Sequence, residues 1–148
     1  MGISIHTGWH FLGNGILDLH DTLNFFMFWG FILLFLAAAF IGGAASRKIA
    51  EYLPPQYMKE GQHSPHLDLY ALDPWIPLPV QRNYILSHFL MGLAGLCLVI
   101  AYVRKGDWGP AAVFFAVGAA GIWGGTTETM TYRRNKRLHE QKEAQGED

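Results

Sequence analysis

Three long apolar stretches, separated by polar or proline-rich segments, form the dominant pattern of this 148-residue chain. The first, residues 23–45, is a run of 23 residues without an ionisable side chain. As a helix it would reach about 34 Å, slightly more than the roughly 30 Å of a bilayer's hydrocarbon core. A chain of this length builds too small a core to bury such a helix on all sides. The pattern therefore predicts a membrane-spanning helix.

The second and third stretches, residues 84–103 and 110–131, are also long enough to span. Only the short polar segment 104–109 separates them, and a proline opens the third stretch, where a helix tolerates it. The pair therefore predicts an antiparallel helical hairpin. We expect an all-α integral membrane protein with three transmembrane helices. Its other segments are an N-terminal segment 1–22, a linker 46–83, and a charged tail 132–148 that extends the third helix and then frays.

The linker 46–83 contains six of the chain's seven prolines, so most of it is expected to be extended or turning. It also has more apolar and aromatic side chains than a solvated linker tolerates. We therefore expect it to lie on a partner or on the headgroup region. The residues expected to dock are Leu69, Tyr70, Trp75 and Ile76.

The positive charges predict an orientation. Nine of the eleven Lys and Arg residues lie in the linker (four) and the tail (five), which share one side of a three-span protein. The N-terminal segment has none and the hairpin loop has two. By the positive-inside rule, the N-terminus is predicted outside, and the linker and C-terminus are predicted cytoplasmic.

Overall charge and motif content exclude several classes of function. The net charge of −1 gives no field that would attract nucleic acid. The chain has no phosphate loop, nucleophile elbow, CxxC or HExxH motif, so an enzyme is not expected. Transporters and channels keep ionisable groups at depth, whereas here only Glu128, near the end of the third span, approaches that position.

Small residues recur at helical spacing in the spans, which predicts close helix packing. They either pack the three helices on one another or contact foreign helices or a flat cofactor. The candidate packing residues are Ala38, Gly42, Ser46, Ala112, Ala116, Ala120, Gly121, Gly124 and Gly125.

His88 is the sharpest candidate ligand. Gly92 and Gly95 follow it at i+4 and i+7, so a planar ring ligated by the imidazole would meet a helix face cleared of side chains. This local arrangement resembles haem-binding and chlorophyll-binding membrane helices, which implies a chlorin or haem. A bis-histidine haem lacks a second ligand in the other spans. The alternative is a histidine near the headgroups, bonded to a linker carbonyl or a lipid.

Two further groups are weaker candidates. His6 and His10, at i, i+4, together with His20, would supply an outer-side site for copper or zinc. The basic run 133–137 is either a contact for anionic bound lipid or only a stop-transfer flank.

Taken together, the sequence predicts a non-catalytic accessory subunit that packs against larger integral membrane subunits within the lipid bilayer. The expected host is an energy-converting assembly, photosynthetic or respiratory, in a bacterial or organellar inner membrane. That host class rests on analogy, because such assemblies carry small subunits without catalytic residues. The alternatives are a chlorin- or haem-binding subunit using His88 and an outer-side metal-binding protein.

Overall fold

The computed structural model describes residues 22–53 and 70–145. This part of the chain is helical without strands and consists mainly of α2 (Thr22–Tyr52), α4 (Leu78–Lys105) and α5 (Trp108–Gln145). Each helix is long and apolar enough to cross a membrane. The predicted all-α fold with three candidate spans is therefore confirmed for the described residues.

The helices are longer than the spans predicted at 23–45, 84–103 and 110–131. The polar flanks continue them, because residues such as Arg, Lys, Glu and Gln favour helix. In particular, α5 runs through most of the charged tail to Gln145 without a break.

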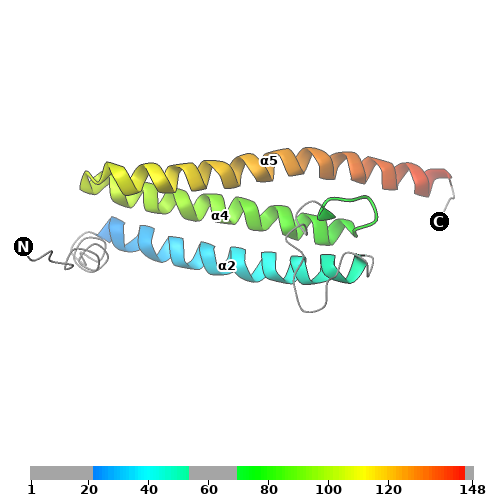
Figure 1. Cartoon of the computed structure of the whole chain (residues 1–148), viewed down its shortest axis with the longest axis horizontal. Coiled ribbons are helices and arrows are strands. Elements are labelled where there is room, and N and C mark those ends of the chain that lie inside the picture. The colour runs from blue at the N-terminus through cyan, green and yellow to red at the C-terminus, as the bar shows by residue number, and fades with distance from the viewer. Residues whose placement is uncertain (1–21, 54–69, 146–148) are drawn as a thin grey trace, which may run out of the picture.

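The three helices lie side by side in a row, with α4 in the middle (Figure 1). Helix α4 packs against both α2 and α5 and separates their backbones, although Phe28 and Phe31 of α2 and Phe114 of α5 pack against one shared cluster. Each outer helix therefore keeps most of its surface facing away from the row.

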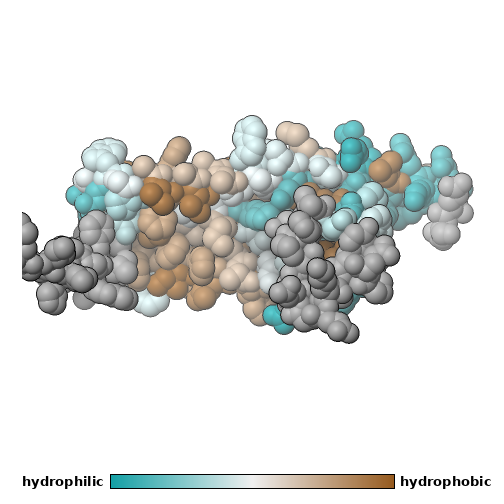
Figure 2. Space-filling model, in the orientation of Figure 1, coloured by the Kyte–Doolittle hydropathy of each residue, from teal (hydrophilic) through white to brown (hydrophobic). Residues whose placement is uncertain are grey.

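An apolar belt covers the middle of the row (Figure 2). Polar side chains gather at the end where α4 turns into α5, and along the C-terminal part of α5. We call the end at the α4–α5 turn the hairpin end. The opposite end, where α2 ends and α4 begins, is called the linker end. This distribution is the one expected of a membrane-embedded protein.

The turn at the hairpin end depends on Gly106, which has a φ of 78°. Its N–H donates to the Val103 carbonyl, and the Asp107 N–H donates to the Tyr102 carbonyl, each at 3.0 Å. Glycine adopts this left-handed conformation without steric cost, so α4 ends here and α5 starts at once.

Glycines form the seam between α4 and α5. A β-carbon on Gly121 would lie 3.0 Å from the Gly92 Cα and from the His88 carbonyl oxygen. One on Gly95 would lie 3.0 Å from the Gly118 Cα. The two backbones therefore meet directly, as small residues allow in membrane helices.

The second seam joins α2 to α4. Ala38 of α2 is buried, and a β-carbon on Gly42 would lie 3.0 Å from the Ser87 Oγ. Ser46 is half-buried on the same helix. Two of the small packing residues predicted on the first span, Ala38 and Gly42, thus lie along this seam.

At the linker end, part of the linker folds back into a small core. Its buried members come from α2, from the segment 70–77 and from α4. They are Ala45, Ile49, Ala71, Ile76, Val80 and Tyr84. Ile76 is fully buried there, so it faces the interior of the chain and not a partner, which corrects its assignment as a docking residue.

Two buried amides fasten α5 to this core. The Asn135 Nδ2 donates to the Leu72 carbonyl at 2.6 Å and to the Gln81 Oε1 at 3.1 Å. The Gln81 Nε2 in turn donates to the carbonyls of Asp73 at 3.0 Å and Ile76 at 2.8 Å. The tail of α5 therefore anchors the returning linker, because buried carbonyls need hydrogen-bond donors.

Candidate functional site

His88 and Glu128 come together across the α4–α5 seam. The His88 Nδ1 lies 2.7 Å from the Glu128 Oε2, a separation typical of a charge-assisted hydrogen bond. The side chains are 35% and 19% exposed, respectively. The Tyr84 ring packs edge-on against the imidazole, with ring centroids 4.7 Å apart. The pair sits where the apolar belt gives way to the polar linker end.

Sequence reasoning missed this pairing, because it considered His88 only as a cofactor ligand or as a residue bonded to a linker carbonyl or a lipid. The sequence did contain a signal for this pairing. In an antiparallel hairpin, residues at similar distances from the turn lie side by side, and His88 and Glu128 are both about twenty residues from Asp107. Both are also ionisable residues within otherwise apolar stretches.

The face of α4 expected to hold a planar ring is occupied by α5. A β-carbon on Gly92 would lie 2.8 Å from the Ile122 Cγ1 and 3.0 Å from the Gly118 carbonyl oxygen. Gly92 and Gly95 are both buried. The glycines that follow His88 therefore admit a neighbouring helix and leave no room for a macrocycle against that face, which corrects the geometry expected for the cofactor.

The candidate metal ligands His6, His10 and His20 lie outside the described residues, as does Leu69. Within the ranges 22–53 and 70–145, no three His, Cys, Asp or Glu side chains gather in a group that would hold a metal ion.

The predicted small residues of α5 divide between two faces. Gly121 and Gly125 face α4, since a β-carbon on Gly125 would lie 3.0 Å from the Phe89 ring. The stripe Ala112, Ala116 and Ala120 is exposed instead, and a β-carbon on Gly124 would meet no atom within 4 Å. We call these four residues the outer stripe.

Beside this stripe, α5 also exposes Val113, Phe115 and Trp123, and the exposed face of α2 is apolar as well. It carries large apolar side chains, which are typical of lipid contact. These exposed residues are Phe26, Trp29, Leu33, Leu36 and Phe40.

Of the remaining predicted docking residues, Trp75 is exposed and Tyr70 is half-buried. Both belong to the segment beside the C-terminal part of α5, since His139 contacts the Pro74 carbonyl at 3.1 Å. An exposed tryptophan is therefore available next to the outermost part of α5.

The fold and these surfaces define a small helical membrane protein with a glycine-packed hairpin and an exposed small-residue face. The chain matches no model of a known protein family, no curated protein and no solved structure.

Proposed function

We propose that this chain is a non-catalytic accessory subunit of a larger membrane complex. The outer stripe of α5 carries the proposal. Ala112, Ala116 and Ala120 recur every fourth residue on an exposed face, so a foreign helix would approach the α5 backbone closely.

Lipid alone does not require such a stripe. A lipid-facing surface gains nothing from small side chains, and the exposed face of α2 shows the large apolar type. In membranes, small residues are enriched where helices pack, because dispersion contacts between backbones replace the hydrophobic effect. The stripe therefore favours a protein partner along this line of α5, beside the exposed Val113, Phe115 and Trp123.

Charge supports an orientation for this subunit. The exposed basic residues Arg47, Lys48 and Arg82 lie at the linker end, where Arg133 and Arg137 of α5 also lie. By the positive-inside rule, this end faces the cytoplasm, or the matrix or stroma of an organelle. Trp75, exposed at the same end, supplies an aromatic contact for a partner outside the bilayer.

The host we propose is an energy-converting assembly, respiratory or photosynthetic, in a bacterial or organellar inner membrane. The support is analogy, since such assemblies carry small subunits that lack catalytic residues. A cofactor-binding role through His88 is less favoured, because α5 fills the space beside Gly92 and Gly95.

The test is co-purification of a tagged chain from its native membrane in mild detergent. Ala116→Leu places a large side chain in the outer stripe and is expected to lower the yield of co-purifying integral membrane subunits at least tenfold. Ala39→Leu makes the same change at an exposed residue of α2 and is expected to leave the yield unchanged. Equal yields from Ala116→Leu and wild type would contradict the proposal.

A further inference from the structure

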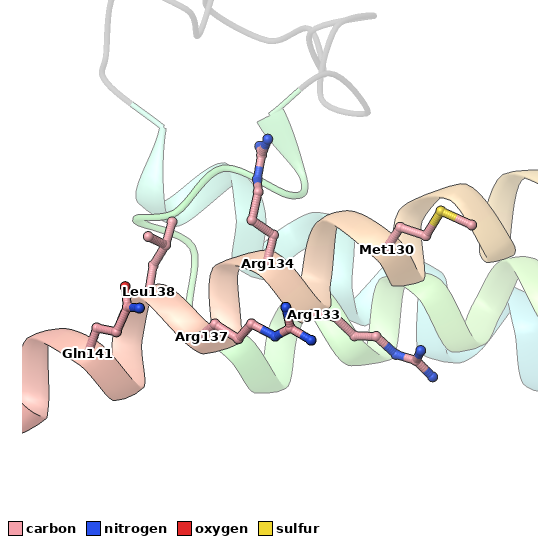
Figure 3. Close-up of a pocket in the computed structure, with 6 residues that line it drawn as sticks. All are labelled: Met130, Arg133, Arg134, Arg137, Leu138 and Gln141. Atoms are coloured by element: carbon pink, nitrogen blue, oxygen red, sulfur yellow. The ribbon is translucent and has the colours of Figure 1, made fainter.

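A hollow of about 400 Å³ lies on α5 beyond Glu128, on the part of the helix that leaves the apolar belt (Figure 3). Three arginines and two apolar side chains surround it. The lining residues are Met130, Arg133, Arg134, Arg137, Leu138 and Gln141.

Arg133 and Arg137 form the basic floor of this hollow. They are four residues apart on α5, so they occupy the same side of the helix. Figure 3 shows both side chains on that side, extending back along α5 toward the end that carries Met130, whereas Arg134 points to the other side. Helical side chains lean toward the N-terminus of their helix. The two guanidinium groups therefore reach back toward the apolar belt.

The nearest acidic side chains of α5 have other partners. Glu128 pairs with His88 at 2.7 Å, and Glu140 lies 3.7 Å from Lys136. No carboxylate among the described residues lies within ion-pair distance of Arg133 or Arg137. The chain thus leaves two adjacent guanidinium groups without an internal counter-ion in the described structure.

The depth of the hollow matches a lipid headgroup. Arg133 follows Glu128 by five residues, about 7.5 Å along the helix, and Glu128 lies at the edge of the apolar belt. Met130 (67% exposed) precedes Arg133 by three residues, on the side of the apolar belt, and offers apolar contact to a glycerol or acyl group. A dissolved anion would gain nothing from contact with this apolar side chain.

We propose that Arg133 and Arg137 bind the phosphate of an anionic phospholipid at this hollow. A guanidinium group pairs with phosphate oxygens through two parallel hydrogen bonds, which a lysine cannot reproduce. Met130 lies on the membrane side of the arginine pair, where the acyl chains of the same lipid leave the headgroup. The site is independent of the proposed subunit role.

The experiment measures retention of phosphatidylglycerol by the full chain in nanodiscs of phosphatidylcholine, with native mass spectrometry as the readout. Each basic residue near an anionic surface contributes roughly fivefold to binding. The double substitution Arg133→Gln with Arg137→Gln is therefore expected to lower phosphatidylglycerol affinity about twenty-fivefold. Arg82→Gln, an exposed basic change at the same end of the protein, is expected to lower it fivefold at most.

Three outcomes would overturn the site. In the first, the double variant retains wild-type affinity. In the second, Arg82→Gln weakens binding as much as the double variant does, which would indicate that general surface charge holds the lipid. In the third, inorganic phosphate at millimolar concentration displaces phosphatidylglycerol from wild type, which would assign the hollow to a free anion. The double substitution Arg133→Lys with Arg137→Lys keeps the charge and the fold. It is expected to bind phosphatidylglycerol several-fold more weakly than wild type, and equal binding would contradict bidentate recognition.

Discussion

Gly121→Ala is the substitution that most sharply tests the glycine seam between α4 and α5. The added β-carbon would lie 3.0 Å from three backbone atoms, namely the Gly92 Cα, the Gly92 nitrogen and the His88 carbonyl oxygen. Ordinary van der Waals contacts of a β-carbon fall between 3.4 and 4 Å. Because all three neighbours are backbone atoms, no side chain can rotate away, and the helices must separate by a few tenths of an ångström.

Overpacking of this kind costs about 1–3 kcal/mol. Alanine also gains up to about 1 kcal/mol of helix propensity over glycine, which hides part of the cost. Gly124→Ala provides the matched control, because its β-carbon would meet no atom within 4 Å and the propensity gain is the same. The two variants of the isolated chain should therefore differ by about 1–3 kcal/mol in the free energy of unfolding, with Gly121→Ala the less stable.

The assay is unfolding of the full chain in mixed micelles by titration with a denaturing detergent, followed by far-ultraviolet circular dichroism. A Gly121→Ala variant as stable as Gly124→Ala would refute the direct backbone contact and, with it, the register of the hairpin.

Two further substitutions test the linker end. Asn135→Ala removes the donor to the Leu72 carbonyl and to the Gln81 Oε1, and it is expected to lower the free energy of unfolding by about 1–3 kcal/mol. It should also speed amide hydrogen exchange in residues 70–77, and unchanged exchange there would refute the anchoring role. Burial raises the pKa of the Asp73 carboxyl above its ordinary value of 3.8, so the folded chain holds that proton more tightly than the unfolded chain does. The resulting stabilisation is fully present below pH 3.8 and is lost as the pH rises through the raised pKa. Asp73→Asn should therefore raise the denaturing-detergent concentration at the midpoint of unfolding at pH 7, and it should have little effect near pH 3. A lower midpoint for Asp73→Asn at pH 7 would contradict this sign.

The three spans could be predicted from the sequence because the hydrocarbon core imposes length and polarity on any helix that crosses it. The run 23–45 lies within α2, and the short polar break after Val103 places the turn at Gly106. Helix ends were less predictable, because the polar flanks at Arg47 and beyond Tyr132 favour helix as strongly as the spans do.

The packing and the site depended on register, which composition does not give. Small residues at helical spacing marked both faces of α5, and only the structure separates Gly121, which touches α4, from Ala116, which is exposed. The pairing of His88 with Glu128 also follows from the hairpin register, which the position of the turn in the sequence already indicates. The burial of Ile76 arises from long-range contacts with α2 that no local pattern signals.

The most direct test of the proposed subunit role is the size and composition of the wild-type chain extracted from its native membrane in mild detergent. The proposal predicts migration with larger integral membrane subunits, and a visible spectrum of that complex that does not change when His88 is replaced by leucine. A monodisperse protein of 16.6 kDa in its detergent micelle, with no other subunit present, would contradict it.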